Sequence, residues 1–370
     1  MPAAVDGDHS AEALRRRRLR AQRLDAAARA DDADVARVVR AVGGIQAQDM
    51  RAATLGVAVR SGRLTGTDIA AALEVSRTVA RAWCMRGTLH LVPADLLAPL
   101  LAVFGPLLVA RGRRRLADLG LDEAACRRGV AVIGEVLAGG ALRTRDEIAA
   151  ALRRDGDLEL RGQAAFHLVR RACLEGVACE AGSRDGRPAY GLRGEWFPAA
   201  PPPPRPLALG ALARWYVDGF APVSRDDFAA WSGLPAEDVR TAWGQVDDLV
   251  EVAPELWAPA PDPGPPPGQP PTVRLAPAFD GYLLGYHDRR HAVAPQHQAS
   301  VHPGGGIIRA TVLVDGRVTG IWSLRRAGGH GRLVVATFSG LPGVPVGALD
   351  TEAARIGTAL DLDVSLAMVG

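Results

Sequence analysis

Thr144-Arg-Asp-Glu-Ile-Ala-Ala-Ala-Leu152 has the pattern of a helix start, and two other stretches of the chain resemble it. They are Thr65-Gly-Thr-Asp-Ile-Ala-Ala-Ala-Leu73 and Ser224-Arg-Asp-Asp-Phe-Ala-Ala230. In each stretch a carboxylate follows a hydroxyl residue by three positions, which is the spacing of a capping box that satisfies free N–H groups at a helix start. The starts are 79 and 80 residues apart, and a period of this length predicts three related modules.

The segments after the three starts predict the rest of each module. A second helix is expected at Val75–Arg81, Gln163–Cys173 and Ala236–Gln245. Strand signals follow, at Thr88–Val92 in the first module, Gly176–Glu180 and Ala189–Leu192 in the second, and Leu249–Val252 and Glu255–Ala258 in the third. Helix, helix and β-hairpin is the order of a winged helix, a helix-turn-helix variant whose second helix can enter a DNA groove. Helical repeats that pack together without binding nucleic acid are the alternative.

Beyond residue 272 the pattern changes to strands. Ile308–Val314 and Val318–Leu324 flank Asp315-Gly316, a type I′ hairpin signal, and a strand at Leu333–Phe338 and a helix at Thr351–Leu360 follow. The proline-rich stretches Pro198–Pro206 and Pro259–Pro271 predict stiff connectors. We therefore expect a predominantly helical α+β protein. It has three tandem winged-helix modules, at residues 12–130, 131–200 and 205–260, and a C-terminal β-rich subdomain at residues 272–370.

Composition excludes several classes of protein. The chain has 370 residues, of which 48% are hydrophobic and 23% charged, as in folded soluble proteins. It contains no Lys and no Asn, so its 44 basic residues are all Arg. P-loop NTPases, kinases and Schiff-base enzymes each need a lysine and are thereby excluded. Four cysteines without C-x-x-C spacing, no signal-peptide pattern and no stretch of about 18 apolar residues predict a cytoplasmic protein without a membrane span.

Charge is unevenly distributed along the chain. Residues 1–130 hold 21 Arg against 14 Asp and Glu, whereas residues 201–271 hold 4 against 10. Such asymmetry predicts one electropositive surface for a polyanion, with solvated helix faces as the alternative. Arg111, Arg113 and Arg114, together with the run Arg15–Arg18, are candidates for contacts with a phosphate backbone.

Two glutamines are the first candidate site. Gln46 and Gln48 follow a helix expected at about Val35–Val42, which ends at Gly43-Gly44. Residues two apart point the same way in an extended segment, whereas on a helix they diverge by about 200°. Two convergent carboxamides can hold one water or one sugar oxygen. A simple polar turn is the alternative.

The C-terminal subdomain holds two further candidates. His287 and His291 have helical metal-ligand spacing, but the Asp-Arg-Arg between them and the nearby Pro295 predict a loop, so we expect no metal and no cofactor. Arg289 and Arg290 lie among these histidines and favour phosphate contacts. Val301-His-Pro-Gly-Gly-Gly-Ile-Ile308 predicts a hairpin tip whose small residues suit entry into a narrow groove. An ordinary loop is the alternative.

Four segments together resemble one family. Gly44-Ile-Gln-Ala-Gln-Asp49, Trp83-Cys-Met-Arg-Gly-Thr-Leu-His-Leu-Val92, Phe279-Asp-Gly-Tyr-Leu-Leu-Gly-Tyr-His-Asp-Arg289 and Val314-Asp-Gly-Arg-Val-Thr-Gly-Ile-Trp322 are similar to the AlkZ/YcaQ-like DNA glycosylases. The resemblance runs in order from about residue 12 to the C-terminus. It implies three winged helices, a concave basic surface, a catalytic hairpin, and a Gln-x-Gln or Gln-x-Asp motif that does the chemistry.

The resemblance implies a function for named residues. Gln46 and Gln48 match the Gln-x-Gln branch, which is associated with resistance of the producer to the azinomycin crosslinker, and Asp49 stands one position too late for the Gln-x-Asp branch. The expected partner is double-stranded DNA that carries alkylated or crosslinked purines, bound by a bacterial, nucleoid-associated monomer. The expected DNA-binding residues are basic or flexible: His302, Gly304, Gly305, Gly306, Arg86, Arg111, Arg113, Arg114, Arg289 and Arg290.

The expected reaction is hydrolysis without strand cleavage. Alkylation at N7 makes a purine a good leaving group, so amides that position a water suffice, and without lysine a Schiff-base lyase step is left only to the N-terminal amine. A crosslinked base is tethered to both strands, so we expect the lesion to be probed within the duplex by a hairpin at residues 297–308. The alternative function is a winged-helix transcriptional regulator that binds DNA without chemistry.

Overall fold

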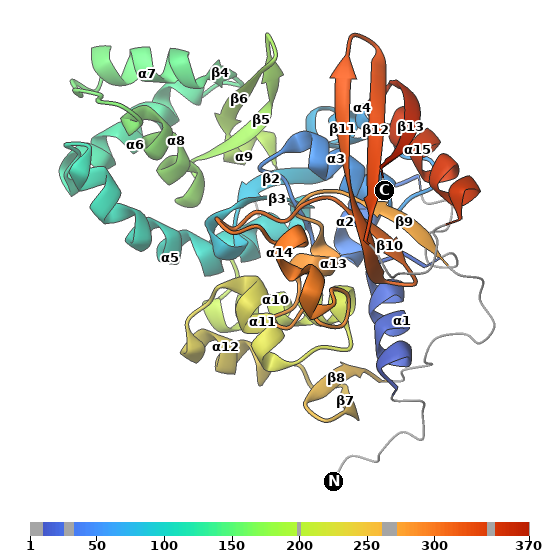
Figure 1. Cartoon of the computed structure of the whole chain (residues 1–370). Coiled ribbons are helices and arrows are strands. Elements are labelled where there is room, and N and C mark those ends of the chain that lie inside the picture. Colours follow the sequence, from blue (N-terminus) through green and yellow to red (C-terminus); the bar gives the residue numbers. More distant parts are fainter. Residues whose placement is uncertain (1–9, 26–32, 198–200, 261–271, 339–344, 370) are drawn as a thin grey trace. The chain divides into compact units, whose positions relative to one another are not determined.

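The computed structural model describes residues 10–25, 33–197, 201–260, 272–338 and 345–369 (Figure 1). Helix accounts for 48% and strand for 22% of it, which confirms the α+β class and the helical predominance. The chain forms two compact units. The first unit combines Met1–Ile69 with Ala213–Gly370, and the second unit is Ala70–Leu212. The units group the chain differently from the four expected segments, because the first unit combines both ends of the sequence.

The first unit contains helices near the N-terminus and a sheet near the C-terminus. The elements before residue 69 are α1 (Ala11–Ala21), α2 (Val35–Ala41), β1 (Ile45–Gln46), α3 (Met50–Ala58) and the start of α4 (Gly66–Glu74). After α10 (Arg205–Phe220), which enters from the second unit, come α11 (Arg225–Ser232), α12 (Ala236–Trp243), β7 (Leu249–Ala253) and β8 (Leu256–Pro259). The remainder is β9 (Val273–Ala276), α13 (Gly281–Leu284), η3 (Pro295–His297), α14 (Gln298–Val301), β10 (Thr311–Val314), β11 (Arg317–Ala327), β12 (His330–Thr337), α15 (Val346–Leu360) and β13 (Asp363–Val369).

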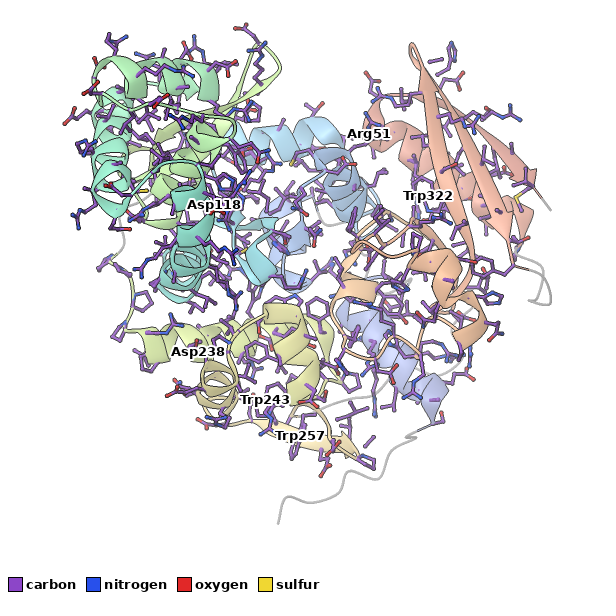
Figure 2. All side chains as sticks on the ribbon, turned by 60° about the vertical axis from the view of Figure 1, so that its left-hand side comes forward. Arg51, Asp118, Asp238, Trp243, Trp257 and Trp322 are labelled. Carbon is purple, nitrogen blue, oxygen red and sulfur yellow. The ribbon has the colours of Figure 1, made fainter. Side chains whose placement is uncertain are left out.

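The C-terminal sheet has five strands in the order β13-β12-β11-β10-β9. β13 pairs in parallel with β12, and the other neighbours are antiparallel. The predicted hairpin turn is confirmed, because Asp315 (φ 47°) and Gly316 (φ 74°) both have the positive φ that a type I′ turn requires. α3 and α15 contribute to the core of this sheet, and Trp322, labelled in Figure 2, donates from its indole N–H to the carbonyl of Ala276 at 2.9 Å.

Glu352 is a buried carboxylate on α15. It accepts a hydrogen bond from Arg355 at 2.8 Å and lies 3.7 Å from Arg274. Burial is the main cause that raises its pKa from 4.5 to about 7, opposed by the charge of Arg274. Since the folded state holds this proton more tightly than the unfolded state, the contribution of Glu352 to stability is largest below pH 4.5 and is lost as pH rises to about 7.

We therefore expect Glu352→Gln to remove this dependence on pH. One proton corresponds to a slope of up to about 1.4 kcal/mol per pH unit. Urea unfolding of both proteins at pH 5 and pH 8 measures it, and the wild type should lose more stability than the variant between the two values. Equal losses in the two proteins would contradict the assignment.

The second unit consists of helices around two small groups of strands. Its elements are β2 (Val79–Trp83), η1 (Met85–Gly87), β3 (Leu89–Pro93), η2 (Ala94–Leu96), α5 (Leu97–Asp118), α6 (Glu123–Leu137), β4 (Arg143–Thr144), α7 (Arg145–Arg154), α8 (Ala164–Leu174), β5 (Ala178–Arg184), β6 (Arg187–Leu192) and α9 (Arg193–Trp196). β2 and β3 are antiparallel, and β4, β6 and β5 form a sheet in that order. The run from α7 to β6 therefore has two consecutive helices followed by a hairpin, as expected for the second module.

All three predicted helix starts are confirmed. Thr144 with Glu147, and Ser224 with Asp227, form complete capping boxes at α7 and α11. The side chain and N–H of Thr65 both bond to Asp68 at the start of α4. The second helix is also found after two of them, as α8 and α12.

The prediction of a second helix at Val75–Arg81 is wrong. The chain leaves α4 at Glu74, and Val79–Trp83 forms the strand β2 instead. In the first module the capped helix is therefore the last helix before the hairpin, whereas α7 and α11 each precede another helix. A capping box is a local signal for a helix start and does not report the position of that helix within a module.

Two further expectations differ in part. α10 begins at Arg205, so Pro206 lies in its first turn, where proline is tolerated, and the connector ends before Arg205. The second connector lies largely outside the described residues.

One helix, Ala94–Asp118, is long and apolar enough by length and composition alone to cross a membrane. Its apolar side chains include Leu100, Phe104 and Leu108, which are buried within the second unit.

Candidate functional site

The two glutamines converge as the sequence predicts. Ile45 and Ala47 are buried, whereas Gln46 is half-buried and Gln48 is exposed, so the extended segment turns both amides to the same side. The side-chain N–H of Gln46 donates to Oε1 of Gln48 at 3.2 Å. That bond uses the amide oxygen of Gln48 and not its NH₂ group, which can still donate to another acceptor. The two amides therefore lie at the protein surface and offer hydrogen-bond donors and acceptors without a formal charge.

The backbone before and after the glutamines is fixed by close contacts. Gly43 has φ 71°, and a Cβ there would meet the ring of Phe220 at 2.4 Å. A Cβ at Gly219 would approach the N atom of Gly43 at 2.7 Å, so only glycine fits at either position. Asp49 caps α3 by accepting from the N–H groups of Arg51 and Ala52. The carboxylate of Asp49 is thus engaged in holding the helix that follows the pair.

The predicted hairpin at residues 297–308 contains less strand than expected. It consists of the end of η3, the short helix α14 and a tight turn closed by the single bridge Gly304–Ile307. Gly304, Gly305 and Gly306 all have positive φ, and their surroundings are open. The turn is exposed together with Ile307, which is 50% exposed, so it forms a small projecting tip.

The basic residues near this tip differ in their exposure and in their hydrogen-bond and ion-pair partners. His302 is half-buried, both of its ring nitrogens lack a hydrogen-bond partner, and burial followed by the charge of Arg289 lowers its pKa. Arg289 is half-buried and donates to the carbonyl of Leu283 at 2.7 Å. Arg290 is exposed but paired with Asp288 at 2.6 Å. Its positive charge is thereby partly compensated.

The loop that contains His287 and His291 does not have the geometry of a metal site. Residues 285–294 are irregular, as predicted, and His291 is packed edge-on against Tyr282 and Tyr286. Burial lowers the pKa of His291 to about 3, so its ring is neutral at physiological pH. Among the described residues there is no group of three or more His, Cys, Asp or Glu that could hold a metal ion.

The arginines of α5 lie on more than one face. Arg111, Arg113 and Arg114 are all exposed, but at 100° per residue Arg113 points away from the other two. Its charge helps to lower the pKa of Glu123 on α6, behind the larger effect of Arg171. Arg111 and Arg114 therefore share one exposed face, and Arg113 lies towards a carboxylate.

Arg86 lies in the turn between β2 and β3. It is half-buried and has φ 55°, a conformation that costs a non-glycine residue energy and often marks a functional site. Arg170 of α8, which sequence reasoning missed, is adjacent: a Cβ at Gly87 would lie 3.5 Å from its Nη2 atom, and one at Gly112 would lie 3.8 Å from its Nη1 atom. Arg170 has no carboxylate partner within the described part of the chain. In the sequence, the doublet Arg170-Arg171 was the feature that could have pointed to it. In the structure Arg171 is the member of this doublet that pairs with carboxylates, those of Glu123 and Glu175.

The run Arg15–Arg18 is not a phosphate-binding surface. Arg15, Arg17 and Arg18 are buried, which corrects the expectation. Arg15 donates to the carbonyl of Asp315 at 2.8 Å, and Arg18 donates to that of Pro222 and lies over the ring of Tyr286. These side chains hold α1 against the rest of the first unit.

A second basic projection was missed from the sequence. The β11–β12 hairpin is the longest pairing of the C-terminal sheet, and its free end extends beyond the neighbouring strands (Figure 1). Its exposed end carries Arg325, Arg326, His330 and Arg332 around the turn Gly328-Gly329. The signal was present as basic residues on both sides of a Gly-Gly pair.

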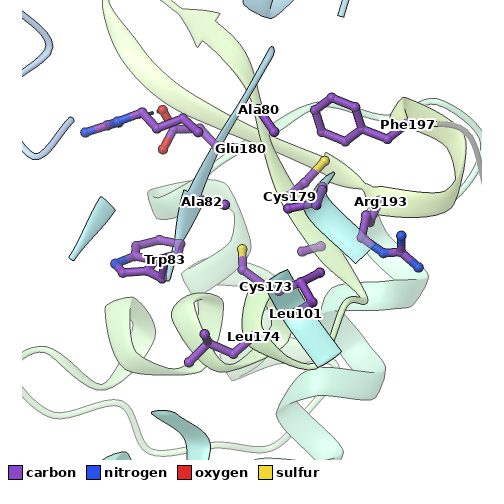
Figure 3. Close-up of a pocket in the computed structure, with 13 residues that line it drawn as sticks. Ala80, Ala82, Trp83, Leu101, Cys173, Leu174, Cys179, Glu180, Arg193 and Phe197 are labelled. Atoms are coloured by element: carbon purple, nitrogen blue, oxygen red, sulfur yellow. Dashed lines mark hydrogen bonds and ion pairs between the residues drawn. The ribbon is translucent and has the colours of Figure 1, made fainter. Parts of the chain in front are cut away.

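The pocket in Figure 3 belongs to the second unit and is lined by residues of α5, α8, β2 and β5. Its volume of about 20 Å³ holds roughly one water, so it is too small for a nucleobase. Cys173 and Cys179 line it, and burial raises the pKa of Cys179 to about 12. Glu180 is paired there with Arg81 at 2.6 Å. These features are those of a core, in which the thiols are unreactive.

Comparisons with known proteins agree with the resemblance. Residues 39–359 match the family described as "DNA glycosylase AlkZ-like". A protein of Streptomyces sahachiroi named "Interstrand DNA cross-link repair glycosylase" is 28% identical over 346 residues, which are 85% of this chain and 88% of that protein. The structure of Streptomyces sahachiroi DNA glycosylase AlkZ has the same fold, with a TM-score of 0.81 and 23% identity over the full length of both chains. Because the family match spans most of the sequence, the chain belongs to the DNA glycosylase AlkZ-like family.

Proposed function

We propose that the protein is a monofunctional DNA glycosylase that hydrolyses the N-glycosidic bond of N7-alkylated purines and unhooks interstrand crosslinks. The convergence of Gln46 and Gln48 carries this proposal, because two neutral amides can orient one water without an ionised base. The name of the Streptomyces relative, a cross-link repair glycosylase, supports crosslinked DNA as substrate. Resistance of a producer to an azinomycin-type crosslinker is the role that we propose for it.

The chemistry needs little help because the leaving group is already cationic. As the bond between C1′ and the purine N9 breaks, its electron pair neutralises the alkylated base, and positive charge develops on the sugar. The oxygen of a water held by Gln46 and Gln48 then bonds to C1′, and its proton passes to bulk solvent. The amide oxygens stabilise the developing charge, and the amides position the water. The product is an abasic site in an intact strand.

We further propose that the helix-helix-hairpin modules are winged helices and that arginines of the second unit hold phosphates. Arg86, Arg111 and Arg114 are the candidates with exposed or strained positions, and Arg170 joins them. In the described part of the first unit, the glycine tip at residues 304–306 and the end of the β11–β12 hairpin are exposed projections that could enter a DNA groove. The acidic stretch 201–271 is not expected to contact DNA.

Base release measures the proposed activity directly. Purified protein incubated with duplexes containing 7-methylguanine or a crosslink should release the modified base, detected by mass spectrometry. Strand breaks should appear only after alkali, because no lysine is available for a lyase step. A transcriptional regulator would instead prefer one unmodified sequence and release no base. Breaks that form without alkali would contradict the monofunctional assignment.

A further inference from the structure

A buried polar network connects three distant parts of the first unit. Arg60 is 1% exposed and donates to both carboxylate oxygens of Asp280, at 2.7 and 2.8 Å. Its Nη2 atom also donates to Oε1 of Gln22 at 2.8 Å, and its Nη1 atom donates to the carbonyl of Gly56 at 3.0 Å. A buried ion pair often adds little net stability over apolar residues of the same volume. The more informative property of this network is therefore how it positions the segments that it joins, rather than how much it stabilises the fold.

Gln22 extends the network to the backbone that precedes the glutamine pair. It is fully buried, and its amide N–H groups donate to the carbonyl of Val42 at 3.1 Å and to that of Gly219 at 2.6 Å. Val42 is the C-cap of α2, four residues before Gln46. One side chain therefore joins the end of α2 to α10 at the point where the chain turns towards the pair.

Arg60 connects the same network to the helix that follows the pair. Asp49 caps α3 directly after Gln48, and Arg60 lies two residues beyond the end of α3 at Ala58. Ile45 is packed against this helix so closely that a Cβ at Gly56 would meet its Cγ2 at 3.0 Å. Both flanks of the extended segment are thus held by one set of buried hydrogen bonds.

We propose that Gln22 and Arg60 are positioning residues that set the location of the Gln46–Gln48 pair, a role that rests on the proposed glycosylase function. They are too deeply buried to touch DNA. Their effect is on the backbone that aims the two amides, and a displacement of about 1 Å at a reacting group can cost about 100-fold in rate. Loss of these hydrogen bonds should therefore slow base release without weakening DNA binding.

Gln22→Met tests the proposal because methionine has a similar volume and cannot donate to Val42. At saturating protein the single-turnover rate of base release should fall by about 10- to 100-fold. The dissociation constant for the same duplex should stay within about twofold of the wild-type value. Rate and binding should respond differently because Gln22 is buried and does not contact DNA. Gln22→Glu is the second variant: it can still accept from Arg60 but cannot donate to Val42 or Gly219, and it should show the same split.

Arg171→Met is the matched control. Arg171 is a buried arginine of the second unit, paired with Glu123 and Glu175. This variant should lower the melting temperature yet keep the wild-type rate, with all proteins assayed well below their melting temperatures. If Gln22→Met does not fold, Gln22→Glu decides the question.

Three outcomes separate the two proposals. Wild-type protein that releases no base overturns the proposed function itself. Active wild type with unchanged rates in the Gln22 variants overturns only the positioning role. A rate loss in Arg171→Met equal to that in Gln22→Met also overturns the positioning role, because general destabilisation would then explain both.

Discussion

Replacing Gln46 and Gln48 together by alanine is expected to reduce the single-turnover rate of base release by about 10³-fold, while DNA binding changes little. Each positioned donor or acceptor in a reaction site typically contributes about 10²- to 10³-fold, and groups that hold one water act as a unit rather than additively. Alanine at both positions leaves only the intrinsic lability of the cationic base. Release of 7-methylguanine, followed by mass spectrometry at saturating protein, measures the rate, and a gel shift measures binding.

Single substitutions distinguish the role of each amide. Gln48→Glu keeps an oxygen that can accept from Gln46 but loses the NH₂ donors, so it should retain more activity than Gln48→Ala if acceptance orients the pair. Gln245→Ala, an amide on the acidic third module, is the matched control and should behave as wild type. Full activity in the double alanine variant would rule out the assigned roles.

Local signals explain why the glutamine pair could be predicted. The alternation of Ile45 and Ala47 with the two glutamines is visible in the sequence, and the period of a strand places the amides on one side. Capping residues likewise predicted the helix starts at Thr144 and Ser224, because the bonds involved span only three residues. Such features depend on neighbours in the chain, which the sequence displays directly.

Features that depend on distant residues could not be predicted in this way. Arg60 meets Asp280 across 220 positions, and nothing near either residue indicates that pairing. The run Arg15–Arg18 resembled a basic surface, although burial against distant segments gives three of its members structural partners. Val79–Trp83 continued a helical pattern by composition and became a strand through its pairing with β3.

Replacing Arg86, Arg111 and Arg114 together by glutamine should weaken DNA binding by about 10²- to 10³-fold at low salt. Each arginine that neutralises a phosphate releases counterions, and the slope of log affinity against log salt should become shallower by about 0.9 for each lost contact. Fluorescence anisotropy with one duplex over a range of salt concentrations measures both quantities. Because phosphate contacts carry no sequence or lesion information, the loss should be equal for alkylated and unmodified DNA.

Two controls make the charge argument specific to position. Arg154 and Arg161 are exposed arginines of the same unit, but they are paired with Asp155 and Glu159, so their replacement by glutamine should leave the salt slope unchanged. Arg113→Gln should have a smaller effect than Arg111→Gln, because Arg113 lies on another face of α5 and acts on Glu123. Equal effects of all six arginines would mean that net charge alone, rather than one built surface, attracts DNA.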